Sequence, residues 1–257
     1  MFDRFRHRSY ELERLDTGEY TAAEYEEMLI ELQRVNRWLG DARALRHCLL
    51  REVTDLDSAS VLDVGAGSGE LLRLVAGTVP ATNTARLVGL ELNRRSARAI
   101  HECSAQFPSI AAVQGSAFEL PFGDGAFDFT FCSLFAHHFG ENDLKTILRE
   151  MRRVTRDRVF VIDLHRHPIA YYFYITVARL FLHNSLVRAD GALSILRSFK
   201  PRELLRLAKE ANLTNVSVAR HFPYRLVLEF SGATVERSAG ETNQAQPADL
   251  MSRGRAA

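Results

Sequence analysis

A glycine-rich turn that follows an apolar segment is the feature that most constrains the fold of this chain. The residues from Val61 to Glu70 read V-L-D-V-G-A-G-S-G-E, and a second apolar segment, L-V-G-L-E, ends at Glu91. Glycine adopts positive φ at little cost and has no Cβ, so the backbone of such a turn can approach a ligand closely. A strand, a turn of this kind and a second strand that ends in a carboxylate together predict a nucleoside-binding site.

The spacing of the glycines distinguishes between two kinds of nucleoside ligand. Dinucleotide sites have the pattern G-x-G-x-x-G, and a pyrophosphate lies at the N-terminus of the helix that follows. Here a single residue separates Gly67 from Gly69, and Asp63 precedes the turn. A carboxylate at that position disfavours phosphate and favours a ligand that carries an ammonium group. S-adenosylmethionine is a ligand of this kind.

A third segment adds a family resemblance. The residues from Gly115 to Phe129 read G-S-A-F-E-L-P-F-G-D-G-A-F-D-F. This segment resembles the G-D-A-x-x-L-P-F-x-D-x-x-F-D stretch of the class I S-adenosylmethionine-dependent methyltransferases, in the small-molecule branch. That branch has the type 11 methyltransferase domain and is similar to enzymes of ubiquinone and menaquinone biosynthesis. The resemblance extends from about Ser60 to His165, and more weakly to Phe230, and it implies S-adenosylmethionine as the cofactor.

The alternation of apolar segments with helical patterns from Ser60 onward predicts an α/β fold. We expect a Rossmann-like, mostly parallel sheet of seven strands with helices on both faces. Two leading N-terminal helices and an insertion after the fifth strand complete the expected fold, and the last two strands are expected as a closing antiparallel pair. The expected strands are Val61–Val64, Arg86–Glu91, Ile110–Gln114, Phe127–Ser133, Arg158–Asp163, Asn215–Arg220 and Arg225–Phe230.

We divide the chain into three parts. Residues 1–58 are expected to form an N-terminal helical cap, in which a helix begins at the capping box of Thr21 and Glu24. Residues 59–230 are expected to form the methyltransferase domain, with residues 166–199 as a substrate-side insertion. Residues 231–257 have few apolar side chains and no periodicity, which predicts a disordered tail. Whether the cap covers the ligand or only packs against the sheet stays open.

The charge balance argues against a polyanionic partner. The sequence has 33 Lys and Arg and 32 Asp and Glu, so its formal net charge is +1 and no strong field concentrates nucleic acid. The three cysteines lack Cys-x-x-Cys spacing, so we expect no metal site. The charged N-terminal residues do not match a secretory signal, and we expect a cytoplasmic location.

The apolar segment Pro168–Leu182 has several interpretations. Its 15 residues are fewer than the roughly 20 that cross a bilayer, so we expect no integral membrane span. The segment can form part of the core, a lid over the substrate, or a peripheral contact with a membrane. The sequence does not predict the oligomeric state.

The resemblance assigns the cofactor contacts to residues near the ends of the strands. Asp63 is expected near the methionine amino group, and Glu91 is expected to accept hydrogen bonds from both ribose hydroxyls. Where the family has an Asp that accepts a bond from the adenine amino group, this chain has Ser116, which lacks the charge that strengthens such a bond. The expected cofactor residues are Asp63, Gly65, Ala66, Gly67, Gly69, Glu91, Leu92, Ser116, Ala117, Phe118 and Cys132.

Two histidines follow the fourth expected strand, in the stretch C-S-L-F-A-H-H-F from Cys132 to Phe139. Methyl transfer depends mainly on positioning, but a hydroxyl or an activated carbon must lose a proton, which an imidazole can accept near neutral pH. We predict His137 and His138 as candidate catalytic residues, and the alternative that they only pack or cap a helix stays open. The expected substrate contacts are Phe135, His138, His165, Tyr171 and Arg197.

The sequence thus predicts methyl transfer from S-adenosylmethionine to oxygen or carbon of a small aromatic or lipophilic acceptor, such as a phenol, a quinol or a polyketide-like ring. The alternative is a non-catalytic S-adenosylmethionine-binding protein that regulates or assists a partner. Nucleic-acid methyltransferases of this class carry an Asn/Asp-Pro-Pro-aromatic motif after the fourth strand, where they hold a flipped base. This chain has C-S-L-F there, so nucleic-acid and protein substrates are less favoured and we expect no nucleic-acid partner.

Overall fold

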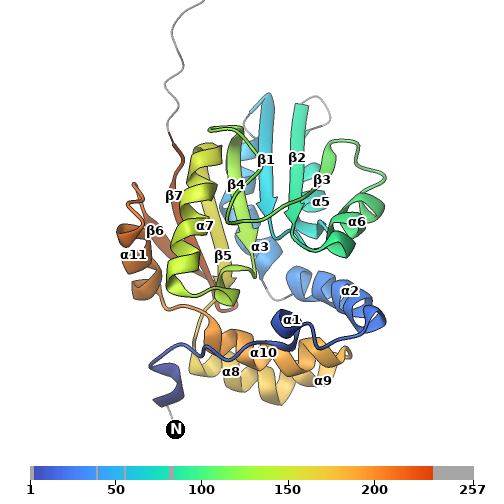
Figure 1. Cartoon of the computed structure of the whole chain (residues 1–257), viewed down its shortest axis with the longest axis vertical. Helices are drawn as coiled ribbons and strands as arrows, with labels where there is room; N and C mark the ends of the chain where they lie inside the picture. Colours follow the sequence, from blue (N-terminus) through green and yellow to red (C-terminus); the bar gives the residue numbers. More distant parts are fainter. Residues whose placement is uncertain (1–2, 39, 55, 81–83, 234–257) are drawn as a thin grey trace, which may run out of the picture.

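A computed structural model describes residues 3–38, 40–54, 56–80 and 84–233. Its centre is a seven-stranded sheet in the order β3-β2-β1-β4-β5-β7-β6 (Figure 1). The strands are β1 (Ser58–Val64), β2 (Thr84–Glu91), β3 (Ile110–Gln114), β4 (Phe127–Ser133), β5 (Thr155–Leu164), β6 (Ser217–His221) and β7 (Arg225–Ser231).

The strand directions confirm the expected mostly parallel sheet. The strands β1 to β5 pair in parallel, and β7 runs antiparallel between β5 and β6. From β1 the chain builds one half of the sheet through β2 and β3, and it then returns to β4 on the other side of β1. Ligands of open α/β sheets bind beyond the carboxyl ends of the strands at such a reversal. The fold therefore directs attention to the ends of β1, β2 and β4.

Alternating side chains of the central strands pack into two separate cores, one on each face of the sheet. In β1, Leu62 and Val64 belong to one core, whereas Ala59 and Val61 belong to the other. The same alternation separates Val161 from Ile162 in β5. Strands that are buried on both faces read as continuous apolar segments, which is why the sequence revealed them.

Helices cover both faces of the sheet, as expected. The first core includes side chains of α7 and α11, and the second includes side chains of α3, α4 and α5. The helices around the sheet are α3 (Asp41–His47), α4 (Leu49–Thr54), α5 (Glu70–Ala76), α6 (Arg94–Cys103), α7 (Glu141–Val154) and α11 (Pro201–Glu210), with a short 3-10 turn η2 (Ala136–His138) before α7.

The N-terminal part contains the two expected helices and additional turns. The first of these helices, α2 (Ala22–Trp38), begins at the predicted capping box, because the amide of Glu24 donates to Thr21 Oγ1 and the amide of Thr21 donates to Glu24 Oε2. The second is divided into α3 and α4 at Cys48. Two short elements precede them, η1 (Asp3–Phe5) and α1 (Arg14–Thr17).

The insertion after β5 is helical and lies with α1 and α2 beyond the carboxyl ends of β1 and β2 (Figure 1). It consists of α8 (Pro168–Phe173), the π-helical segment η3 (Tyr174–Ala178), α9 (Arg179–Phe181) and α10 (Ser185–Arg197). The sequence did not predict α10. Its Gly191 lowers helix propensity but is required by packing, since a Cβ there would lie 2.3 Å from the Tyr174 hydroxyl.

The C-terminal boundary of the sheet differs by one residue from the expected one, because β7 continues to Ser231. Residues 234–257, on which the prediction of a disordered tail rests, lie outside the described residues. Within the residues that the structure does describe, no helix combines the length and apolar character needed to cross a bilayer.

Candidate functional site

A cavity of about 810 Å³ lies at the carboxyl ends of the strands. Its floor includes the predicted glycine turn, the end of β2 at Glu91 and the loop that follows β4. The N-terminal segment and the insertion supply the opposite walls, largely with apolar side chains such as Leu12, Leu15, Met28, Leu29, Leu182 and Leu186. A cavity of this size can hold a small-molecule ligand.

The glycine turn has the conformation that its sequence requires. Gly65 and Gly67 have φ angles of 74° and 59°, a region that favours glycine. A Cβ at Gly65 would lie 2.4 Å from the ring of Phe135, so the absence of a side chain lets this aromatic ring pack on the turn. A Cβ at Gly67 would meet nothing within 4 Å. The backbone at Gly67 is therefore open toward a ligand.

Two carboxylates lie beside this turn. The side chain of Glu91 accepts a hydrogen bond of 2.6 Å from the amide of Gly67, and burial raises its pKa to about 7. Asp63 is 2% exposed, and its Oδ1 atom has no hydrogen-bond partner in the described structure. Burial, and then repulsion from Glu91, raise the pKa of Asp63 well above its usual value. A buried carboxylate without a partner is costly, so this pair favours a ligand that brings positive charge or hydroxyl donors.

The remaining predicted cofactor residues fall into two groups. Ala66 and Leu92 line the cavity, whereas Gly69, Ser116, Ala117, Phe118 and Cys132 are outside its lining. Gly69 serves as the N-cap residue of α5, and Cys132 is buried in a core of the sheet. The hydroxyl of Ser116 accepts a bond from the amide of Phe118 within its own turn.

His137, one of the two predicted catalytic histidines, is held by a carboxylate. Its Nδ1 lies 2.7 Å from Asp163 Oδ1, and its backbone amide donates to Asp163 Oδ2 at 2.9 Å. Burial by itself would raise the pKa of Asp163, but the charge and hydrogen bonds of His137 lower it below its usual value. A proton on Nδ1 that faces this carboxylate leaves Nε2 as the acceptor atom of the neutral ring.

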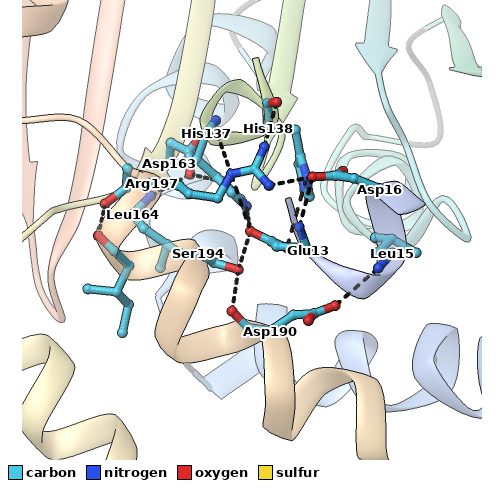
Figure 2. A network of polar contacts seen from close by, with 12 residues as sticks. Glu13, Leu15, Asp16, His137, His138, Asp163, Leu164, Asp190, Ser194 and Arg197 are labelled. Carbon is cyan, nitrogen blue, oxygen red and sulfur yellow. Dashed lines mark hydrogen bonds and ion pairs between the residues drawn. The ribbon is translucent and has the colours of Figure 1, made fainter. Parts of the chain in front are cut away.

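His138 and the N-terminal segment complete a polar network (Figure 2). The Nδ1 atom of His138 lies 2.8 Å from Asp16 Oδ1. Glu13 Oε1 accepts a hydrogen bond of 3.0 Å from Ser194 and lies 3.9 Å from His137 Nε2. Burial raises the pKa of Glu13 to about 7. The structure thus brings two acidic side chains of the cap to the two predicted histidines.

Arginines attach the cap to the histidine loop. The buried side chain of Arg197 donates to the carbonyl oxygens of His137, His138 and Glu11, and it forms an ion pair with Asp16. Arg8 donates to the carbonyl oxygen of His137 as well. Arg197 therefore positions the loop and is outside the cavity lining, in contrast to its expected role as a substrate contact.

The other expected substrate contacts are also divided. Phe135, His138 and His165 line the cavity, and Tyr171 does not. The Tyr171 ring packs against Phe5, with 5.6 Å between the ring centroids, and its hydroxyl accepts a bond from Arg4. This side chain therefore joins the N-terminal segment to α8.

Among the described residues, one group has the donor types of a metal site, namely Glu13, His137 and His138. Each histidine already uses Nδ1 to bond an aspartate, and the Arg197 Nε atom lies 3.8 Å from Glu13 Oε1. A guanidinium this close opposes a second cation. The expectation that the chain needs no metal stays a prediction.

Sequence reasoning missed Glu13, Asp16 and Ser194. These residues belong to no local motif, and Glu13 and Ser194 are separated by 181 positions. Asp163 is different, because its place near the end of the fifth strand makes it visible in the sequence as a candidate near the pocket, as Asp63 is near the end of the first strand.

Comparisons with known proteins agree with this geometry. Residues 62–162 match the family described as a methyltransferase domain. An uncharacterized methyltransferase of Synechocystis is 33% identical over 108 residues, which are 41% of this chain and 47% of that protein. The chain thus spans about half the length of this relative. The demethylmenaquinone methyltransferase of Bacillus velezensis is 29% identical over 175 residues, which cover 62% of this chain and 73% of that protein.

The chain belongs to the class I S-adenosylmethionine-dependent methyltransferases. A solved structure of such a methyltransferase from Aquifex aeolicus has the same fold, with a TM-score of 0.59 and 15% identity over 80% of this chain and 98% of that one. S-adenosylmethionine is accordingly the cofactor. The site fits it, because Asp63 Oδ1 lacks a partner, the backbone at Gly67 is open, and Glu91 lines the same cavity.

Proposed function

We propose that this methyltransferase transfers a methyl group to an oxygen, or to an activated carbon, of a small lipophilic acceptor, and that His137 accepts the proton that the acceptor loses. The observation that carries the proposal is the bond between His137 Nδ1 and Asp163. A methyl acceptor that loses no proton would need no such base.

The residues at the ends of β1 and β2 hold the donor in this proposal. Asp63 attracts the ammonium group of the methionine moiety, and Glu91 accepts bonds from the ribose hydroxyls. When bound, S-adenosylmethionine supplies a methyl group on a positively charged sulfur. The apolar cap over the cavity excludes water, which strengthens these electrostatic contacts.

His137 and Asp163 act at the acceptor end. Asp163 fixes the ring so that Nε2 can take a proton, and it stabilises the imidazolium that results. Glu13 lies on the Nε2 side of the same ring and adds to that stabilisation. Arg197 keeps the cap in place over this pair.

The walls of the cavity support a lipophilic acceptor. The cap and the insertion contribute mainly aliphatic and aromatic side chains, including Phe173 and Leu182. One relative is named as a demethylmenaquinone methyltransferase. From this name we take only the proposal that the acceptor has a hydrophobic ring. The absence of a nucleic-acid partner is part of this proposal, supported by the net charge of +1. A cytoplasmic location belongs to the same proposal.

The test is incorporation of a labelled methyl group. The full-length protein is incubated with methyl-labelled S-adenosylmethionine and a metabolite extract, and products are identified by mass spectrometry. We expect a labelled small lipophilic product that depends on His137, with His101→Gln as a matched control because His101 is exposed on α6. Tight cofactor binding without any labelled product would support the alternative, a regulatory S-adenosylmethionine-binding protein.

A further inference from the structure

The outer face of the insertion exposes an unusual number of large apolar side chains. The helical segments α8, η3 and α9 follow one another without interruption from Pro168 to Phe181. Five of their side chains are largely exposed, namely Ile169 (59%), Phe173 (50%), Val177 (41%), Leu180 (76%) and Phe181 (73%). We call this set the apolar stripe. Contiguous exposed apolar surface on a folded domain commonly marks a contact with a partner or a membrane.

The spacing places these side chains on one side of the helix. Ile169, Phe173 and Val177 are four positions apart, and Leu180 and Phe181 follow three and four positions later. Positions three or four apart are neighbours on a helical surface. The opposite side of the same helix is buried, because Ala170, Tyr171 and Tyr174 belong to an internal cluster. The helix is therefore amphipathic, and the stripe is its exposed apolar face.

The surroundings of the stripe are basic. The sequence from His165 to Ala189 has no aspartate or glutamate. Of its arginines, Arg188 is exposed, whereas Arg166 is buried and forms an ion pair with Glu203. Arg4 on η1 and Arg6 just after it are both exposed, and the bond from Arg4 to the Tyr171 hydroxyl joins this turn to α8. Asp3, paired with Arg6, is the acidic side chain of that turn. This charge distribution complements an anionic surface, although the whole chain has a net charge of only +1.

The stripe also reaches the cavity. Phe173 is half exposed and at the same time lines the cavity, and Leu182 lines it directly after the end of α9. Figure 1 shows α8 and α9 as the outermost layer beyond the carboxyl ends of β1 and β2. The stripe and the cavity therefore share Phe173.

We propose that the apolar stripe docks this protein onto the surface of an anionic lipid bilayer, with the stripe inserted among the acyl chains and the arginines at the headgroups. Amphipathic helices with aromatic and aliphatic residues on one face and basic residues beside it bind membranes in this way. A second copy fits less well, since a two-fold contact through the stripe would bring equal basic surfaces together. The docking goes beyond the proposed function, and its test requires neither cofactor nor acceptor.

The experiment is vesicle flotation of the full-length protein. One set of vesicles contains only phosphatidylcholine, and a second set contains one third phosphatidylglycerol. We expect binding to the anionic vesicles that is at least tenfold stronger than to the neutral ones and that weakens at high salt. The same result is expected whether or not the protein methylates anything, so failure of this proposal and failure of the proposed function are distinguishable.

Two variants locate the contact. Leu180→Asp and Phe181→Asp should each reduce binding to anionic vesicles at least tenfold while preserving the circular dichroism spectrum and S-adenosylmethionine affinity. Ile30→Asp changes an exposed aliphatic residue of α2 outside the stripe and should leave vesicle binding unchanged. Absence of vesicle binding, equal binding to both vesicle types, or full binding by the stripe variants would overturn the proposal. So would a wild-type dimer that the stripe variants convert to monomer in light scattering.

Discussion

The two halves of the sheet end in buried carboxylates that have opposite surroundings. Asp63 at the end of β1 has a side-chain oxygen without a partner, and burial raises its pKa. Asp163 at the end of β5 accepts bonds from the ring and amide of His137 and from the amide of Leu164, and its pKa is lowered. Both residues are almost fully buried, at 2% and 1% exposure.

The difference separates two functions of a buried charge. The β1 and β2 end is left incomplete by the protein, so a ligand must supply the missing donors. The β4 and β5 end is complete without a ligand, and its carboxylate orients a histidine. We infer that the first end is built for the donor and the second for proton transfer from the acceptor.

The largest expected effect concerns the second end. His137→Gln should lower kcat about 10²–10⁴-fold, the usual contribution of a positioned base, while the Kd for S-adenosylmethionine stays within about twofold. The measurement pairs turnover of the acceptor found by labelling with calorimetric titration of the cofactor. His101→Gln should change neither quantity. Loss of cofactor binding in His137→Gln would contradict the assignment of donor binding to one end of the sheet and proton transfer to the other.

The pH dependence of stability sharpens the contrast at the first end. The pKa of Glu91 is raised from 4.5 to about 7, so Glu91 binds its proton more tightly in the folded state. Its stabilising contribution is therefore full below about pH 4.5 and is lost as the pH rises to about 7. Relative to Glu91→Gln, the apo wild type should lose up to ~3 kcal/mol of unfolding free energy over this range, at about 1.4 kcal/mol per pKa unit. Urea unfolding at several pH values, with Glu102→Gln as an exposed control, measures this difference, and parallel curves would contradict it.

Matched amide substitutions compare the two aspartates directly. In the wild type, Asp163 accepts hydrogen bonds from the ring and amide of His137 and from the amide of Leu164. In Asp163→Asn the NH2 group cannot accept, so at least one of these donors loses its acceptor and the free energy of unfolding should fall by about 1–3 kcal/mol. Asp63→Asn removes a carboxyl group whose ionisation is disfavoured by burial, so the apo stability of this variant relative to the wild type should rise with pH. Thermal and urea unfolding without cofactor test both variants. A loss of stability in Asp63→Asn equal to that in Asp163→Asn would show that the two sites do not differ.

The sequence predicted that the residues of the first end lie together, because they are close in the chain. Asp63, the glycine turn and Glu91 lie within one strand-turn-helix-strand unit, and each residue type is imposed by backbone geometry or by charge. The strands were recognisable for a similar reason, since burial on both faces leaves a continuous apolar segment. Asp128, which looks like a motif residue, instead bonds Ser60 and Arg156 near the amino ends of β1, β4 and β5.

The second end was predicted only in part because it is assembled from distant segments. The histidine pair was visible, but Glu13 and Asp16 come from the cap, and Ser194 comes from α10, a helix that the sequence did not reveal. Gly191 obscured α10, because a glycine in a sequence commonly marks a turn. Here the glycine is needed for close packing against Tyr174 inside a helix. Such pairings depend on tertiary packing, which no local pattern encodes.

The central claim is that the carboxylates at the ends of β1 and β2 bind the donor, and titration calorimetry with S-adenosylmethionine tests it most directly. Asp63→Ala and Glu91→Ala should each weaken binding at least tenfold, about 1.4 kcal/mol, whereas Glu102→Ala and Asp163→Asn should leave the Kd within about twofold. Wild-type affinity in both Asp63→Ala and Glu91→Ala would contradict the account, because the donor would then be bound elsewhere.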